Sequence, residues 1–238
     1  MEDDTGRRLH DRWRRPINDF RTRACFKGNS NSVVGVCFKG NSYNVVGNRA
    51  NVTGDFNIVT GSRAVVTGNT NNVHGRRAKA TGDYNLVNGS RAVVTGNSNN
   101  VHGSRAKANG DYNLVVSSRT IVNGNSNNVH GSRARVTGDN NRVFGSRAVA
   151  NGNSNVFGSR ANVTGDYNIV YGIKAQVNGK RNRICAEGVT VEGEDNLVIG
   201  SNIINKGQNT KIKIIPDGKP IICRFEDFDA LKDQLQSI

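Results

Sequence analysis

The chain has 238 residues, of which 33 are Lys or Arg and 19 are Asp or Glu, so its formal net charge is +14. Apolar residues make up 35% of the chain and aromatic residues 6%, which excludes a conventional globular core of large side chains. Composition alone would indicate disorder, but a strict sequence repeat with 28 glycines in the chain favours an ordered structure.

The first segment, residues 1–27, is rich in arginine and lies mostly outside the repeat. We predict that it is a basic N-terminal arm or a cap, and residues 1–24 fit either a helix over the first coil or an extended arm. Solenoids need such covers, because the unpaired strand at an open end can pair with other chains.

A fourteen-residue unit, Gly-Asn/Asp-x-Asn-x-Val-x-Gly-Ser-Arg-Ala-x-Val-Thr/Asn, occupies residues 28–206. Repetition at a fixed period is typical of stacked solenoids, and glycines at both halves of the unit predict two corners joined by two short strands. We therefore predict an all-β protein, a parallel β-solenoid (β-roll) of about thirteen 14-residue coils. The units Gly28–Lys39 and Gly152–Thr164 are shorter, and we place their deletions at a corner or bulge, because a slip within a strand would turn inward side chains outward.

Residues 207–238 form a predicted C-terminal cap. Residues 211–215 and 221–225, separated by the turn 216–219, are typical of a hairpin, and residues 226–236 of a short helix. The cap would cover the last coil of the solenoid.

Alternation within each strand predicts which side chains point inward. One half of the coil turns Asn and Val inward, as at Asn85 and Val87, and the other turns in Ala and a second small residue, as at Ala64 and Val66. We expect a narrow, dry core in which the buried amides of successive coils hydrogen-bond to one another, as buried amides require.

An outward column of cations occurs at the same corner of successive coils. We call it the arginine row, and it comprises Arg49, Arg63, Arg77, Arg91, Arg105, Arg119, Arg133, Arg147, Arg160 and Lys174. Neighbouring unit charges about 4.8 Å apart repel by on the order of 1 kcal/mol even in water, so the row predicts an anionic partner.

A column of aspartates occurs on alternate coils, which makes twenty-eight residues the full period. Its members are Asp55, Asp83, Asp111, Asp139 and Asp166. In a flat fourteen-residue coil, which we prefer to a four-sided coil of twenty-eight residues, this column lies at the corner opposite the arginine row. Three partners for the row stay open: the aspartates of another subunit, a polyanion such as nucleic acid, and counter-ions from solvent.

The sequence offers no catalytic, cofactor or metal site. No nucleophile lies near a base, no spacing suggests zinc, and His74, His102 and His130 would be about 9.6 Å apart from coil to coil, too far to share an ion. We expect all four cysteines, Cys25, Cys37, Cys185 and Cys223, to be buried reduced thiols, although a disulfide between the stacked Cys25 and Cys37 is geometrically possible.

Threonines form a single outward rank, which raises the question of ice binding on a flat β-solenoid. Asn109, Asn123 and Asn151 interrupt the rank and lysines flank it, so we do not expect that activity. Its members are Thr53, Thr67, Thr81, Thr95, Thr137 and Thr164.

The repeat resembles a known family. Residues 87–96, Val-Asn-Gly-Ser-Arg-Ala-Val-Val-Thr-Gly, are similar to the head repeats of bacterial trimeric autotransporter adhesins, and the resemblance covers residues 28–206. It implies a left-handed parallel β-roll that assembles as a trimer.

We thus expect a non-enzymatic structural protein, a rigid homotrimeric rod that acts as a spacer or cementing component of a larger assembly, with a virus particle as one setting. The alternative is a module that binds nucleic acid through the arginine row. The polar N-terminus and the absence of a long apolar run predict a cytoplasmic protein, or one packaged into a virion, with no membrane insertion.

Overall fold

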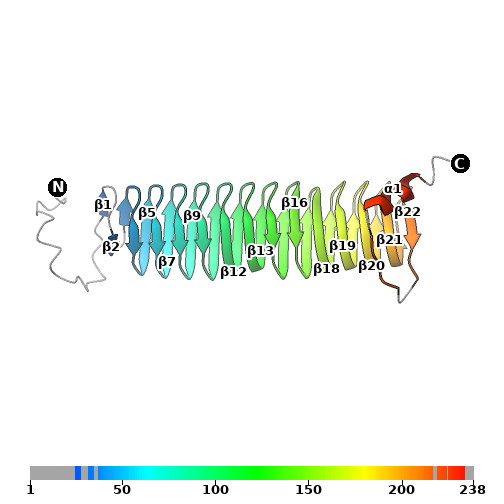
Figure 1. The fold of residues 1–238 in the computed structure, drawn as a ribbon, viewed down its shortest axis with the longest axis horizontal. Helices are drawn as coiled ribbons and strands as arrows, with labels where there is room; N and C mark the ends of the chain where they lie inside the picture. The colour runs from blue at the N-terminus through cyan, green and yellow to red at the C-terminus, as the bar shows by residue number, and fades with distance from the viewer. Residues whose placement is uncertain (1–24, 28–31, 35–36, 217–218, 224, 234–238) are drawn as a thin grey trace, which may run out of the picture.

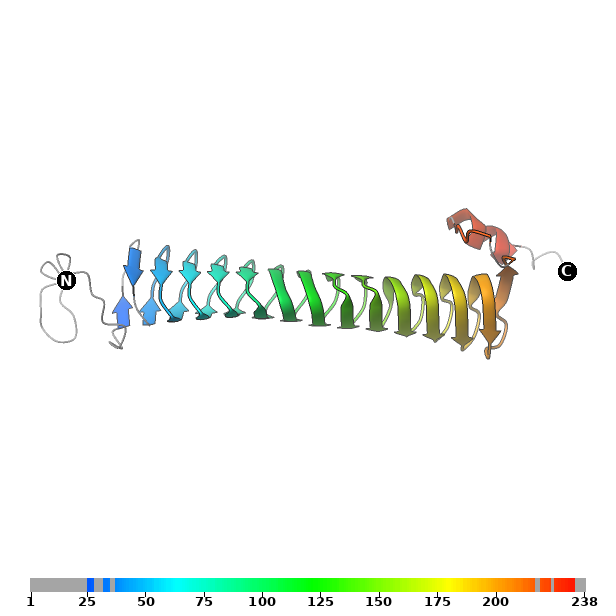
Figure 2. The same ribbon diagram turned by 90° about the horizontal axis from the view of Figure 1, so that it is seen from below.

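A computed structural model describes residues 25–27, 32–34, 37–216, 219–223 and 225–233. The described strands form one 22-stranded sheet that winds into a straight rod of stacked coils (Figure 1), and every pairing between strands is parallel. β1 and β22 lie at opposite ends of the rod, and the perpendicular view in Figure 2 shows the same order of coils from blue to red. The predicted parallel β-solenoid is confirmed.

Two faces make up each coil. The arginine face carries β1 (Cys25–Lys27), β3 (Cys37–Lys39), β5 (Arg49–Thr53), β7 (Arg63–Thr67), β9 (Arg77–Thr81), β11 (Arg91–Thr95), β15 (Arg133–Thr137) and β17 (Arg147–Asn151). The opposite face carries β2 (Ser32–Val34), β4 (Asn44–Val46), β6 (Ile58–Thr60), β8 (Asn72–His74), β10 (Leu86–Asn88), β14 (Asn128–His130), β16 (Asn141–Phe144) and β22 (Lys211–Ile214). The longer strands run from the opposite face onto the arginine face: β12 (Asn100–Asn109), β13 (Leu114–Asn123), β18 (Ser154–Thr164), β19 (Ile169–Asn178), β20 (Arg183–Glu192) and β21 (Leu197–Asn205).

Strand register confirms the fourteen-residue coil and places the two deletions. Most partners are fourteen residues apart, as Ala92 and Ala106 are. In the short unit Gly152–Thr164, Thr137 pairs with Asn151 but Asn141 pairs with Ser154. The missing residue therefore lies between these two pairs, at the corner that follows the arginine-face strand, which we call the glycine corner. In the first unit, Val34 pairs with Val46 but Cys37 pairs with Asn51, so two residues are missing between β2 and β3. Because β3 begins at Cys37, Arg49 and Ala50 of β5 have no partners in it. Only the deletion before Ser154 is confirmed to avoid the strands.

The core consists of the predicted small side chains. Buried and exposed residues alternate along each strand of the arginine face, as in Arg63–Thr67, where Ala64 and Val66 point inward. On the opposite half of the coil, each buried Asn accepts a hydrogen bond from the coil before it. Asn85 donates its backbone N–H to Asn99 Oδ1 at 2.8 Å and its Nδ2 to the same oxygen at 3.2 Å. This buried ladder confirms the expected pairing of amides, and Ser154 interrupts it.

The glycine corner has a second ladder on its outer side. At Gly110 φ is +127°, and an added Cβ would lie 2.3 Å from the carbonyl oxygen of Gly96, so only glycine fits. The next residue is Asn or Asp, and its Oδ1 accepts the backbone N–H of its equivalent on the next coil. Asn97 donates in this way to Asp83 at 2.6 Å, and Asp111 donates to Asn97 at 2.8 Å.

The C-terminal cap differs from the prediction. β22 continues the coil register and pairs in parallel with β21, and residues 219–223 are not in a strand, so the predicted hairpin is wrong. The predicted helix is confirmed as α1 (Phe225–Asp233), and its Phe228 and Leu231 pack near Ile199. Residues 234–236, the expected end of the helix, and the proposed arm at residues 1–24 lie outside the described residues.

A disulfide ties the cap to the rod. Cys185 in β20 and Cys223 before α1 are bonded, with their Cα atoms 6.1 Å apart. Our expectation of reduced thiols at these positions is therefore wrong: the cap folds back onto the opposite face and brings together two cysteines that are 38 residues apart. The possible Cys25–Cys37 disulfide involves a side chain outside the described part of the chain.

Candidate functional site

The arginine row lies in register along one edge of the arginine face. Each member opens its strand or its part of a longer strand, and each pairs with its equivalent on a neighbouring coil, as Arg91 does with Arg105 and Arg105 with Arg119. The side chains of all ten members are exposed. The row therefore presents one cation per coil on ten successive coils, as the sequence pattern requires.

No member of the row forms an ion pair with any residue that the structure describes. The described ion pairs all lie toward the C-terminal end and involve Lys180 with Glu194, Arg181 with Asp195, Arg183 with Asp229, and Lys213 with Asp227. Repulsion along the row, on the order of 1 kcal/mol per neighbouring pair in water, is consequently not offset by carboxylates of the described residues.

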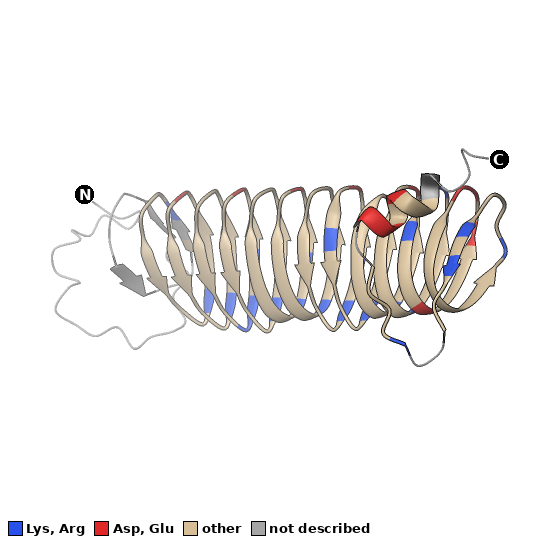
Figure 3. Cartoon of the chain, turned by 45° about the vertical axis from the view of Figure 1, so that its right-hand side comes forward, with Lys and Arg blue, Asp and Glu red and all other residues tan. Residues whose placement is uncertain are grey.

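The five aspartates lie along the other edge of the coils, which we call the acidic edge. Figure 3 shows acidic positions at the tops of the coils and basic positions along the bottom. Residues 40–178 contain no other acidic side chain. One carboxylate oxygen of Asp83 already accepts the N–H of Asn97, so this column also stabilises the corner.

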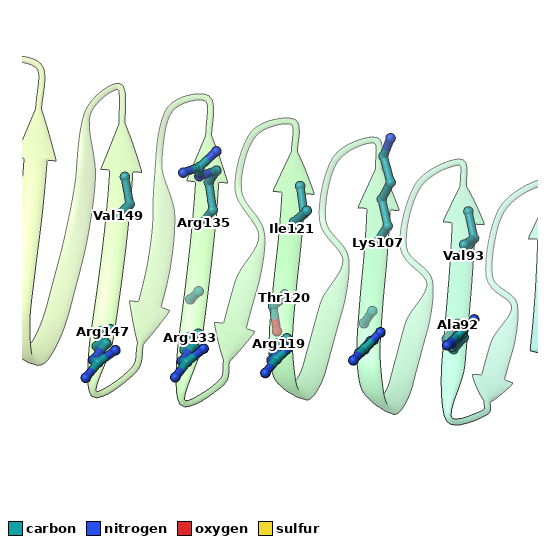
Figure 4. A pocket seen from close by; sticks show the side chains of 14 residues that line it. Ala92, Val93, Lys107, Arg119, Thr120, Ile121, Arg133, Arg135, Arg147 and Val149 are labelled. Atoms are coloured by element: carbon teal, nitrogen blue, oxygen red, sulfur yellow. The ribbon is translucent and has the colours of Figure 1, made fainter. Parts of the chain in front are cut away.

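A second rank of side chains runs beside the arginine row on the same face. It alternates between basic and apolar residues, as in Lys107, Ile121 and Arg135, which point outward in Figure 4. Between the two ranks runs a shallow groove of about 630 Å³ from Arg91 to Val149. A second groove of about 690 Å³ shares Arg147 and Val149 with the first and continues it to Lys174. The face thus offers a long, basic, shallow channel, and its strands between Arg49 and Asn178 carry no carboxylate.

A ladder of aromatic rings on the opposite face was missed by the sequence reasoning. The rings of His130, Phe144, Phe157 and Tyr171 stack on successive coils, with centroids 4.6, 4.8 and 5.2 Å apart. Their spacing of fourteen and thirteen residues was the available signal. His74 and His102 lie on alternate coils of the same rank, and the described residues hold no group of three potential metal ligands.

One arginine binds at the acidic edge within the chain itself. The Arg181 guanidinium lies 5.7 Å from the centroid of the Tyr167 ring, donates a hydrogen bond to the Tyr167 hydroxyl, and pairs with Asp195 at 3.8 Å. The hydrogen bond to Tyr167 and the electrostatic interaction with the same side chain raise the pKa of Arg181, and the charge of Asp195 adds to the shift. Beside it, the hydrogen bond to Glu194 raises the pKa of Lys180. This edge therefore attracts cations.

None of the helices that the structure describes is long and apolar enough to cross a membrane. A family model described as a grass antifreeze beta roll matches residues 80–152, which include the central part of the arginine row. A search of curated proteins found no match, and neither did a search of solved structures. The family match and the coil geometry together make this chain a β-roll repeat protein, and they give no support to the finer resemblance to autotransporter head repeats.

Proposed function

We propose that this chain is a non-enzymatic structural protein, a rigid spacer or cementing component that is fixed in a larger assembly by an anionic partner lying along the arginine row. The observation that carries the proposal is the row itself: ten exposed cations in register, on a face that has no carboxylate to match them. Such a row raises the free energy of the isolated rod, and an anionic partner would lower it.

Rigidity supports the spacer role. Between Arg49 and Asn178, successive coils are joined by strand pairing on both faces, by the corner ladder and, except at Ser154, by the buried Asn ladder. Bending the rod would lengthen hydrogen bonds in several of these ladders at once. A rod of this kind keeps two attached components a fixed distance apart.

A virus particle is one setting that we propose for such an assembly. The Cys185–Cys223 disulfide is consistent with it, because disulfides persist on virion surfaces and other oxidising sites but are rare in the cytosol. Synthesis in the cytoplasm followed by packaging would combine both environments, and a homotrimer is the oligomer that we propose.

Polyanion binding is the second candidate, and the groove is the observation that favours it. Lys79, Lys107 and Arg135 add a second line of cations beside the row, and the groove between the two lines is open along its length. A nucleic acid strand lying there would contact guanidinium groups from several coils through its phosphates.

Ice binding, which the name of the matched family suggests, is not proposed for this chain. Within the matched residues, Asn109 and Asn123 interrupt the threonine rank on the arginine face. Lys79, Lys107 and Arg135 occupy the neighbouring outward rank on every second coil, and a Lys ammonium is strongly hydrated. No flat rank of threonines remains.

The test is light scattering after size-exclusion chromatography across a salt series, with and without nucleic acid. We expect oligomers that dissociate as the salt concentration rises, and we expect the triple substitution of Arg91, Arg105 and Arg119 to Gln to shift them towards monomers. Arg142→Gln, an exposed cation on the opposite face, is the matched control. A wild-type monomer that binds DNA with a steep salt dependence would replace the structural role with the second candidate, and a monomer that binds nothing would refute both.

A further inference from the structure

Exposed aromatic rings follow the aspartates along the acidic edge. Phe56, Tyr84, Tyr112 and Tyr167 are 62%, 67%, 69% and 59% exposed, and each comes directly after an aspartate. Tyr84 and Tyr112 have φ of +57°, a left-handed conformation that few large side chains adopt. Ser98 occupies the same corner position with φ of +54°, so the corner does not need a ring there. The rings are therefore unexplained by the packing of the rod.

The negative charge of the aspartates is equally unexplained by the corner. On alternate coils Asn97 makes the same hydrogen bond to the backbone that Asp83 makes, at 2.8 Å against 2.6 Å. An amide oxygen is therefore sufficient for the corner ladder. In Asp83 that bond uses Oδ1 alone, which leaves the charge and the second oxygen of the carboxylate for another partner.

The chain shows which partner this combination of groups takes. Arg181 sits against the ring and hydroxyl of Tyr167 and pairs with the carboxylate of Asp195, all at this edge. A guanidinium is suited to such a site because it stacks over a ring and donates to oxygen atoms at the same time. Around Tyr84 and Tyr112, no arginine of the described chain makes this contact.

We propose that the acidic edge, with its aspartates and aromatic rings, is the docking surface for the arginine row of a second copy of this chain. The inference rests on the proposed function, because it names the anionic partner of the row. Both surfaces run along the rod with the same rise per coil, and they lie on opposite edges of the same coils. Copies laid side by side and in parallel therefore match row to edge over many coils at once.

The arrangement is heterologous, since two different surfaces meet. The arginine row has one cation per coil, and the edge has one aspartate on every second coil. An aromatic ring follows four of the five aspartates, whereas Asn140 follows Asp139. Alternate arginines therefore face an aspartate, while the others face Asn with Ser or Thr. Repetition of the same contact gives either a closed ring, such as a trimer, or an open lateral array.

The test converts two acidic coils into the neutral type that the chain already contains. The variant carries Asp83→Asn, Tyr84→Ser, Asp111→Asn and Tyr112→Ser, which reproduce the Asn97 and Ser98 corner and preserve its hydrogen bonds. The reciprocal variant carries Asn97→Asp and Ser98→Tyr and adds one docking position. Sedimentation velocity over a concentration and salt series measures self-association, and circular dichroism confirms that each variant keeps the wild-type fold.

We expect the neutral variant to self-associate about tenfold more weakly than the wild type, and the reciprocal variant to associate more strongly. Equal association of the neutral variant and the wild type would overturn the inference, as would a wild type that is monomeric at low salt. If the arginine-row variant loses assembly while the neutral variant keeps it, the proposed function survives and the partner of the row is not this edge.

Discussion

Asn113 provides the sharpest test of what holds the rod together. It is 1% exposed, and its Oδ1 accepts the backbone N–H of Asn99 at 2.9 Å. Its Nδ2 donates to the carbonyl oxygen of Gly110 at 2.8 Å and to Asn127 Oδ1 at 3.1 Å. The side chain thus joins three successive coils, and we expect Asn113→Ala to be strongly destabilising.

The magnitude follows from the groups left without partners. The buried N–H of Asn99 loses its acceptor, which costs about 1–3 kcal/mol, and each neutral hydrogen bond lost from Nδ2 contributes about 1 kcal/mol. We therefore expect Asn113→Ala to lower the free energy of unfolding by about 3–5 kcal/mol. Ser154, which occupies the same column, shows that a small polar residue is accommodated there, so Asn113→Ser should cost less.

Urea denaturation followed by circular dichroism measures this loss, and hydrogen exchange at Asn99 reports whether the coil opens locally. Hydrogen exchange is needed because repeat arrays can unfold in parts. Asn162→Ala, on the exposed side of β18, is the control and should change the stability by less than about 0.5 kcal/mol. If the two substitutions have the same effect, the buried ladder does not stabilise the rod.

Two further predictions concern the corner and the cap. Gly110→Ala should prevent proper stacking of the coils, because φ is +127° and the new Cβ would clash with the Gly96 carbonyl oxygen. Gly188→Ala, whose new Cβ would have its nearest atom at 3.4 Å, should cost only about 1 kcal/mol. Thermal melting compares the two variants, and equal losses of stability would contradict the steric argument. Cys223→Ser should make residues 219–233 sensitive to limited proteolysis and leave the circular dichroism of the rod unchanged. The reason is that the disulfide closes a 38-residue loop, which corresponds to roughly 4 kcal/mol of chain entropy. Protease resistance equal to that of the wild type would show that α1 stays in place without the disulfide.

The repeat made the rod predictable because one relation, between a residue and its equivalent fourteen positions on, determines nearly all of its contacts. From Asn85 and Val87 in one half of the coil and Ala64 and Val66 in the other, the interior could be assigned residue by residue, and the structure confirms each of them as buried. The corner deletion before Ser154 followed from the same relation, because only a corner can lose a residue without turning the strand over.

The cap could not be predicted in this way, because its contacts do not repeat. Lys211–Ile214 has the alternation of a strand, but the turn at 216–219 led to a predicted pairing with residues 221–225, whereas the strand continues the coil register and pairs with β21. The pairing of Cys185 with Cys223 depends on how α1 folds over the opposite face, which no local pattern encodes. The sequence shows the regular spacing of the aromatic residues, but their stacking could be recognised only from the strand register of β14, β16, β18 and β19.

The twenty-eight-residue period leads us to a final prediction, which concerns the length of the rod. Deleting residues 82–109 joins Thr81 to Gly110 and keeps the alternation, so Lys79 is still followed by the apolar Ile121. Deleting only residues 82–95 joins Thr81 to Gly96 and stacks Lys79 on Lys107, which adds repulsion on the order of 1 kcal/mol. Small-angle scattering should show rods shortened by about 9.6 and 4.8 Å. The shorter deletion should melt earlier at low salt, and the difference should vanish at high salt, because screening removes the repulsion. If the rod unfolds after the twenty-eight-residue deletion, each coil depends on more than its two neighbours. That result would contradict the conclusion that the hydrogen-bond ladders between neighbouring coils stabilise the rod.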